Sequence, residues 1–445
     1  MAGGSAETIY FGCGYAELSH WQFVLDTPME KKVIAIIATL DTKGPEAGFV
    51  KARIESAGYG TLILDTGILT RTDPQAPVPE VSADEIAREG GEDRSDLIAR
   101  SGEKETRNRG IRAMAKGCTK ILRRLYDEGR VCAVIGLGGA QGTEIGTSAM
   151  RALPIGVPKV MVSTVASGQA PFGMYTGTRD ITMMHSVVDI LGLNALTRRI
   201  LANAAGAVVG MADVRLAEDD SRRLRVGITI YGQTTPAALA IKPKLEEKGY
   251  EVYAFHSNGT GGKAMEELAS EGLLDALFDL STHELVDEIF GGIHASDHSR
   301  LLAGGLKGLP RLVVPGGLDL ITLREPETVP EAYRAQPFVR HNPHITLVRL
   351  TKDQMIRVAE VMVERLNQAT GPVVVVIPTG GFSFYNRDGL HFRDMEADRA
   401  FTQFLRDRLK TNIPVLEINS HVNDPPFVGE ILDIFEELVK PYKFP

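Results

Sequence analysis

One pattern occurs twice in the sequence, and this repeat most limits the folds available to the chain. The segment VKARIESAGYGTLILDTG at 50–67 aligns with IKPKLEEKGYEVYAFHSNG at 241–259, an offset of 191 residues. An apolar run precedes each copy, VIAIIA at 33–38 and LRVGIT at 224–229. Each copy therefore predicts a strand, a polar turn, a helix that stops at a Gly-Tyr pair, and a second strand. Glycine suits the left-handed residue that ends a helix, and proline in the turn suits the first helical residues.

A strand, a helix and a strand in this order form the unit of a parallel sheet with helices on its faces. We therefore expect the α/β class: two Rossmann-like, doubly wound domains with mainly parallel sheets, related by internal duplication. The predicted divisions are an N-terminal extension at 1–28, a first domain at 29–218 and a second at 219–445, with the boundary in the charged stretch 215–225. Later strands are predicted at 308–317, 371–381 and 412–421.

Composition excludes several classes of protein. The formal net charge is −8 and the pI is about 5.8, so no excess of basic charge favours nucleic acid. The basic segment 107–130 has helical spacing, and we interpret it as a helix with a solvated basic face rather than an RNA-binding patch. No apolar run approaches the eighteen or so residues of a membrane span. Residues 1–28 lack the features of a secretory signal. The three cysteines have no close spacing and support neither a zinc site nor disulfides. We expect a cytoplasmic protein.

A glycine-rich loop follows the apolar run VCAVI in the first half. It places Gly136, Gly138, Gly139, Gly142 and Thr143 before an apparent helix. Glycines let backbone approach an anion closely, and the start of a helix offers unpaired N–H groups. The loop has neither the Walker lysine nor a clean dinucleotide fingerprint, so a tight turn without a ligand is the alternative.

Two further loops of the first half carry polar residues. STVASG includes Ser167, and TGTRDIT brings Thr178, Arg179 and Asp180 together before an expected helix. Arginine beside hydroxyls suits phosphate or carboxylate, and we include Arg179 and Asp180 among the candidate catalytic residues. An aspartate cap on the helix, with Arg179 in an ion pair, is the alternative. The charged stretch 74–110 is interpreted as a surface loop, or else as a lid.

The second-half relative of the glycine loop is FHSNGTGGKAMEEL at 255–268. We expect it to hold the carboxylate or phosphate of a small substrate through Asn258, Gly259, Thr260, Gly261 and Gly262, with His256 available for proton transfer. A structural histidine at a strand end is the alternative. Near the C-terminus His341, His421 and Asp424 could form an acid/base or metal set, and His421 is a candidate catalytic residue. No HxH or HExxH spacing joins them, so the metal stays unknown and no nucleophile is identified.

Several motifs together resemble a known family. They are IATLDTKG, GLGGAQGT, TGTRDITMMHSVVDILGLN, FHSNGTGGKAME, HNPHITLVR and HVNDPPF. In this combination the chain resembles the Tm-1-like ATP-binding family, uncharacterised protein family 0261, from about Lys31 to about Phe427. The segment before Met29 falls outside the pattern, and we expect no counterpart after Phe427 of the barrel domain that the plant member carries.

The resemblance implies a pair of Rossmann-like domains that bind ATP, with Mg²⁺, in the first, and a homodimer. It implies nucleotide contacts from Gly138, Gly139, Gly142 and Thr143, with Thr39, Asp41, Ser167, Thr178 and Arg179 as neighbours. We expect an ATP-dependent or nucleotide-regulated enzyme that acts on a small carboxylated or phosphorylated metabolite at the cleft between the domains. The alternatives are a non-enzymatic ATP-binding module that regulates a partner protein, and a nucleotide-independent lyase or hydrolase that uses the second-domain loops.

Overall fold

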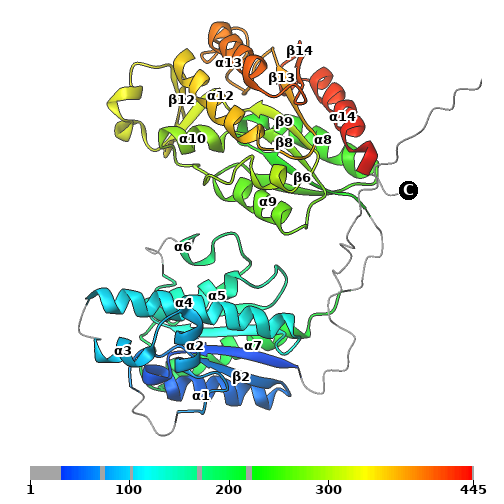
Figure 1. Ribbon diagram of the computed structural model, residues 1–445. Helices are drawn as coiled ribbons and strands as arrows, with labels where there is room; N and C mark the ends of the chain where they lie inside the picture. Colours follow the sequence, from blue (N-terminus) through cyan, green and yellow to red (C-terminus); the bar gives the residue numbers. More distant parts are fainter. Residues whose placement is uncertain (1–31, 71–75, 101–103, 168–172, 217–222, 443–445) are drawn as a thin grey trace, which may run out of the picture. The chain divides into compact units, whose positions relative to one another are not determined.

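The structure is a computed structural model that describes residues 32–70, 76–100, 104–167, 173–216 and 223–442 (Figure 1). The proposed extension at 1–28 and most of the boundary segment 215–225 lie outside these ranges. The chain divides into two compact units, residues 1–216 and 217–445, and each is described by itself.

The first unit has one five-stranded parallel sheet. Its strands are β1 (Val33–Ala38), β2 (Gly60–Asp65), β3 (Ala133–Gly138), β4 (Lys159–Ser163) and β5 (Thr182–His185). Their order is β2-β1-β3-β4-β5, and every neighbouring pair is parallel. Strand order reverses between β1 and β3, and in doubly wound sheets ligands bind outside the carboxyl ends of the strands at this point.

Helices cover both faces of this sheet (Figure 1). They are α1 (Leu40–Ser56), α2 (Ala83–Gly90), α3 (Arg94–Ala99), α4 (Lys104–Asp127), α5 (Ala140–Arg151), α6 (Gly173–Thr176) and α7 (Ala195–Asp213). Apolar residues of α2, α4 and α5 pack on one face of the sheet, and those of α1 and α7 pack on the other. The strands alternate accordingly, because Ala35 and Ile37 belong to the first cluster and Ile34 and Ile36 to the second.

The second unit repeats the same strand order. Its six-stranded parallel sheet consists of β6 (Arg225–Ile230), β7 (Glu251–His256), β8 (Ala276–Ser281), β9 (Arg311–Gly316), β13 (Val373–Pro378) and β14 (Val415–Ile418). The order is β7-β6-β8-β9-β13-β14, so the first strand lies between the second and the third, as in the first unit. The predicted α/β class and the pair of parallel sheets are confirmed, and the strands predicted at 308–317, 371–381 and 412–421 correspond to β9, β13 and β14.

Helices also lie on both faces of the second sheet. They are α8 (Thr235–Glu247), α9 (Thr260–Ser270), α10 (Glu284–Phe290), α11 (Ala303–Leu306), α12 (Lys352–Leu366), α13 (Met395–Arg408) and α14 (Pro425–Val439), with 3-10 turns η1 (Gly232–Thr234), η2 (Pro326–Thr328), η3 (Glu331–Tyr333) and η4 (Lys440–Tyr442). The helices α8 and α14 pack on one face, and α10, α12 and α13 on the other. A small antiparallel sheet of β10 (Leu320–Leu323), β12 (Ile345–Arg349) and β11 (Phe338–Asn342) is inserted after β9 and was not expected.

The local signals of the repeat hold in detail. Gly58 and Gly249 follow the two equivalent helices with φ of 93° and 87°, the left-handed conformation predicted for them. Pro236 lies in the first turn of α8, and Pro45 follows a break at Lys43, where α1 leaves helical geometry. None of the described helices has the length and apolar character needed to cross a membrane.

Two local predictions were wrong. Within 74–110, which was interpreted as a loop or lid, the described residues form α2, α3 and the start of α4. Ser82 and Asp93 cap the first two helices through their side chains. The residues after TGTRD form strand β5 rather than a helix, because this short segment pairs with β4 at the edge of the sheet.

Candidate functional site

A cavity of about 670 Å³ lies at the carboxyl ends of the first sheet, at the switch point between β1 and β3. Three segments supply most of its wall: Thr39 to Lys43 after β1, Gly139 to Gly142 after β3, and Thr106 to Gly110 at the start of α4. Its volume falls in the range of sites for small molecules and cofactors, roughly 300–1,000 Å³. The predicted glycine loop therefore opens into a space large enough for a nucleotide.

The opening turn of α5 lines this cavity with backbone. Gly139 is the N-cap residue and offers no side-chain acceptor, and among the described residues no side chain accepts from the first N–H groups of this helix. Such N–H groups, together with the helix dipole, form an anion-binding position. A Cβ at Gly139 would meet only Thr164 Oγ1, at 3.7 Å, whereas one at Gly138 would lie 2.6 Å from Gly142 Cα. Gly138 is thus required for the turn itself, and Gly139 is not.

Charged side chains of both signs border the cavity. Among the described residues no carboxylate pairs with Lys43. Arg107 lies against Gln141, whose amide oxygen, when turned toward it, accepts from the guanidinium Nε and Nη2 at 2.6 Å each. Asp41 accepts a hydrogen bond from the Leu69 N–H at 2.8 Å, and Asp189 is exposed at the rim. The cavity can therefore offer two cations to an anion and two carboxylates to a cation.

A buried carboxylate holds the loops behind this cavity in place. Asp65, the last residue of β2, accepts from the N–H groups of Leu40 and Gly67 at 3.0 and 2.9 Å through one oxygen. Burial raises the pKa of this carboxyl above its ordinary value. Asp65 thus ties the start of α1 to the loop after β2.

The residues predicted to contact nucleotide after β1 and β3 divide into two groups. Thr39, Asp41, Gly139 and Gly142 line the cavity. Gly136 instead lies inside β3, where a Cβ would be 2.5 Å from Met161 Sδ. Thr143 is buried, and its hydroxyl bonds to Ser163 Oγ at 2.7 Å. Gly136 and Thr143 therefore serve the packing of the strands next to the site.

The TGTRD residues lie elsewhere in the first unit. Thr178, Arg179 and Asp180 precede β5, so they lie at the amino ends of the parallel strands, opposite the edge that carries the cavity. Asp180 pairs with the buried Lys159 at 2.7 Å and accepts from the Gly156 N–H at 2.8 Å. Burial lowers the pKa of the Lys159 ammonium, which the ion pair opposes. Asp180 thus has a structural role here, and this geometry gives no support to catalysis by Arg179 or Asp180. Ser167 is exposed beyond β4 and is not among the cavity residues.

The second-unit glycine loop does bind an anion, but the anion is part of the chain. The N–H groups of Gly259 and Gly262 both donate to Glu284 Oε1 at 2.9 Å. A Cβ at Gly262 would lie 1.9 Å from Glu284 Oε2, and one at Gly261 would lie 2.1 Å from the His256 carbonyl oxygen. Glycine is therefore needed at 262 to leave space for the Glu284 carboxylate and at 261 to allow the close contact with the His256 backbone. The expectation that this loop binds a substrate anion is corrected at the N–H groups of Gly259 and Gly262, because Glu284 occupies them. Asn258 and Thr260 are exposed beside it, and substrate contacts from them stay a prediction.

Glu284 belongs to a fully buried network of charges. Its members are Arg300, Arg311, Glu266, Asp279 and Glu284, each with no exposed surface. Arg300 reaches Asp279 at 2.6 Å and Glu284 at 2.8 Å. Two cations face three carboxylates, so one negative charge is in excess, and the N–H groups at the start of α9 stabilise it. The network fixes the end of β8 against α9.

The two histidines that were proposed as catalytic differ in environment. His256 ends β7 and is exposed, and its ring lies edge-on to the ring of Tyr231 with the two centroids 6.4 Å apart. His421 is 3% exposed. Its Nε2 donates to the Ser383 carbonyl at 2.8 Å, and its Nδ1 accepts from the Asn423 N–H at 3.1 Å. Burial lowers the pKa of His421. Hydrogen bonds on both ring nitrogens favour a structural role for His421, whereas the His256 ring is exposed.

Sequence reasoning missed the segment STHELVDEIFGGIH at 281–294. It follows β8 at the switch point of the second sheet and places His283, Asp287 and His294 together. The signal was present, since His283 and Asp287 are four residues apart on one helical face. His341 stays separate from these groups, in β11 of the antiparallel sheet.

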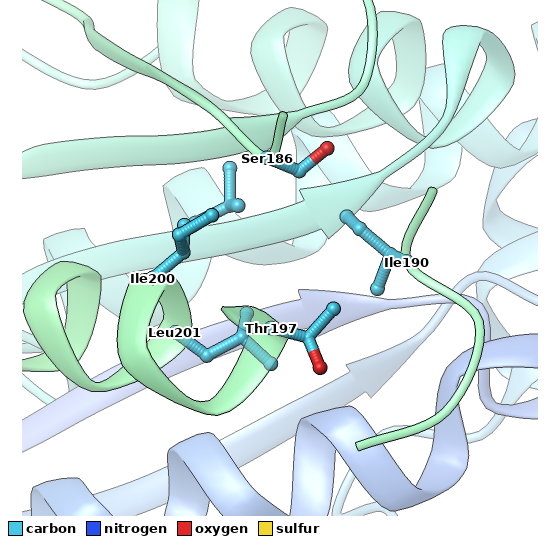
Figure 2. A pocket seen from close by; sticks show the side chains of 6 residues that line it. Ser186, Ile190, Thr197, Ile200 and Leu201 are labelled. Carbon is cyan, nitrogen blue, oxygen red and sulfur yellow. The ribbon is translucent and has the colours of Figure 1, made fainter. Parts of the chain in front are cut away.

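A second hollow in the first unit is not a ligand site. Figure 2 shows it between α7 and the sheet, with Ile190, Ile200 and Leu201 directed into it. It has no room for a water molecule. It is part of the packing interface between α7 and β4, next to the Asn194–Thr197 capping box at the start of the helix.

Comparisons with known proteins match nearly the whole described chain. The model of the N-terminal domain of Uncharacterised protein family (UPF0261) matches residues 32–217, and that of its C-terminal domain matches 223–439. A UPF0261 protein of Clostridium tetani is 39% identical over 400 residues, 90% of this chain and 96% of that protein. A UPF0261 protein of Mesorhizobium japonicum is 39% identical over 409 residues, 91% and 99% of the two chains.

A plant protein is also similar. The ToMV resistance protein Tm-1 of Solanum lycopersicum is 36% identical over 341 residues, 75% of this chain and 45% of the tomato protein. Among solved structures, UDP-GlcNAc 2-epimerase of Methanocaldococcus jannaschii aligns over 84% of this chain and 99% of its own, with 9% identity and a TM-score of 0.22, too low to bear on function. From the two domain models and the bacterial relatives, the chain belongs to the UPF0261 family.

Proposed function

We propose that the first unit binds ATP as its Mg²⁺ complex, with the phosphates at the start of α5. The observation that carries this proposal is the 670 Å³ cavity at the β1/β3 switch point. One wall is glycine backbone at a helix N-terminus, and the lining includes Lys43 and Arg107. These are the groups that phosphate oxygens require.

The residues present also fit the metal ion. Mg²⁺ in nucleotide sites is usually held by one or two carboxylates together with phosphate oxygens and water. Asp41 and Asp189 are the carboxylates of the cavity wall, and they would hold the ion. The ion would neutralise part of the phosphate charge, which Lys43 and Arg107 also do.

A metabolic reaction on a small anion, the activity expected from the sequence, would need a second site. The loop expected to supply it holds Glu284 instead. The proposal for the first unit is therefore nucleotide binding alone.

Substitution of Gly139 tests the placement of the phosphates. The added methyl of Gly139→Ala meets only Thr164 Oγ1 at 3.7 Å, so the fold should be unchanged, but the methyl covers the approach to the helix N-terminus. By isothermal calorimetry with Mg-ATP we expect at least a tenfold loss of affinity, about 1.4 kcal/mol. Lys43→Ala should have a similar effect.

Arg112→Ala is the matched control, because Arg112 lies on the same helix as Arg107 and its side chain is 70% exposed. Its affinity for Mg-ATP should stay within twofold of the parent chain. If the parent chain binds no nucleotide, the proposal fails. If Gly139→Ala binds ATP with the same affinity as the parent chain, the phosphates lie elsewhere.

A further inference from the structure

We propose that the second unit carries a site for a divalent transition-metal ion, of which zinc fits best, formed by His283, Asp287 and His294. One ligand atom from each residue lies within 4.8 Å of the other two. Two imidazoles and one carboxylate form a donor set found in zinc hydrolases and in non-haem iron sites. The site lies at the β6/β8 switch point and is independent of the nucleotide cavity.

Local sequence brings the three side chains together. His283 precedes α10 and Asp287 lies one turn later on the same face. The chain then turns at Gly291, where φ is 79°. A Cβ at Gly292 would lie 2.1 Å from Asp287 Cγ, so only glycine lets the backbone close around this carboxylate. The turn returns His294, whose N–H donates to Asp287 Oδ2 at 2.8 Å.

The hydrogen bond of His283 Nδ1 leaves the lone pair of Nε2 available to a metal ion. Its Nδ1 lies 2.9 Å from the Gly317 carbonyl, which can only accept, so Nδ1 carries the proton. The lone pair is then on Nε2, and a backbone carbonyl on the other nitrogen is the usual support of a metal-bound histidine. Tyr231 stacks on the ring at 4.2 Å and fixes its plane.

The distances match a coordination site better than a hydrogen bond. His283 Nε2 and Asp287 Oδ2 are 3.4 Å apart. Two ligand atoms about 2.0–2.1 Å from a tetrahedral ion lie roughly 3.3 Å from each other. Thr322 Oγ1 is 2.8 Å from the same Nε2, so its hydroxyl proton would turn toward Tyr231 Oη, 2.9 Å away, when metal binds.

His294 supplies the independent observation. Its Nδ1 is buried, and no described group hydrogen-bonds to it. A buried polar atom without a partner costs about 1–3 kcal/mol, and a bound metal ion would supply the missing partner. Its ring also lies edge-on to His283, with centroids 5.8 Å apart. Three protein ligands leave the fourth position for water or for an oxygen of a small acid.

Titration of the untagged full-length chain, first stripped with a chelator, tests the site. Co²⁺ should bind at one equivalent per chain with the visible absorption of four-coordinate cobalt, and Zn²⁺ should displace it. His294→Ala should weaken Zn²⁺ binding at least about 100-fold, since loss of outer-shell partners alone costs 10–100-fold. His298→Ala is the control, because that side chain is 94% exposed and lies outside the cluster.

Folding of the variants is checked without metal. His294→Ala removes a ring that makes no hydrogen bond to any described residue, so the melting temperature of the metal-free protein should stay within a few degrees. His283→Asn is a second variant, whose amide can still donate to the Gly317 carbonyl and which should also lose Zn²⁺. Absence of one-to-one binding in the parent chain, or equal affinity in the parent and in either folded variant, would overturn the proposal.

Discussion

Replacement of Glu284 by alanine is the most informative perturbation of the second unit. The change deletes the carboxylate that accepts from Gly259 and Gly262 and that pairs with Arg300. The remaining network has two arginines and two carboxylates, so no charge is left uncompensated. The cost therefore falls on three donors that lose their acceptor: the N–H groups of Gly259 and Gly262 at the start of α9, and the buried Nε of Arg300.

The magnitude follows from these three donors. Each buried N–H without an acceptor costs about 1–3 kcal/mol, so Glu284→Ala should lower the free energy of unfolding by about 4 kcal/mol. For a unit of this size each kcal/mol lowers the melting temperature by about 2–4 °C, which gives roughly 8–16 °C. Glu284→Gln keeps an oxygen for the N–H groups and should lose about half as much.

Calorimetry of the full chain measures the loss of overall stability, and hydrogen exchange measures the local loss of protection at the glycine loop. The amides of 259–262 should lose protection in Glu284→Ala. Formate or acetate should restore part of the stability by entering the vacated position, with no comparable effect on the parent chain. Glu246→Gln is the control, because its pair with Lys242 on α8 is exposed and should contribute less than about 0.5 kcal/mol.

The reasoning is refuted if Glu284→Ala melts within about 2 °C of the control and its exchange at 259–262 is unchanged. In that case the glycine loop does not depend on an internal anion. Rescue by small carboxylates that is equal in the parent chain and the variant would equally exclude Glu284 as the occupant.

Two further predictions concern other buried charges. Asp180→Ala should destabilise the first unit by about 1–2 kcal/mol in denaturant unfolding, because Lys159 loses its carboxylate, yet leave Mg-ATP affinity within twofold; a tenfold loss would contradict the structural role. Burial raises the pKa of Asp398 to about 6, above the ordinary 3.8, against the opposing effect of Arg349. Because the pKa is higher in the folded state, the stability that Asp398 contributes is full below pH 4 and is lost as the pH rises through 6. The free energy of unfolding of Asp398→Asn should therefore rise relative to that of the parent chain by up to about 3 kcal/mol between pH 4 and 7. A difference between the two proteins that does not change with pH in urea unfolding would disprove this.

Much of the fold could be predicted because its determinants are local. Apolar runs set β1, β6 and β13, and the glycine that ends each repeated helix adopts the predicted positive φ. The short strand β5 was missed since its partner β4, rather than its own sequence, determines its conformation. The antiparallel sheet after β9 likewise depends on pairing between distant segments.

The candidate sites show the same division. The position of Gly139 at a switch point follows from strand order, and this could be anticipated. The sequence could not show which of the two similar glycine loops stays open, because Glu284, which fills the second loop, is 22 residues beyond Gly262. Local spacing shows that a loop can accept an anion, but it does not show whether the chain supplies one.

The occupied loop also decides where chemistry in the second unit can be. Glu284 is held by the start of α9, and His283 immediately precedes it. The internal anion therefore anchors the segment that carries His283 at the switch point, with Arg300 bonded to the Ser281 carbonyl at 2.9 Å on the other side. The glycine loop that we propose as a ligand site in the first unit corresponds, in the second unit, to a loop that supports its neighbour. Since preorganised side chains require such rigid support, the residues after β8, rather than the glycines after β7, are where a reaction of this unit should be sought.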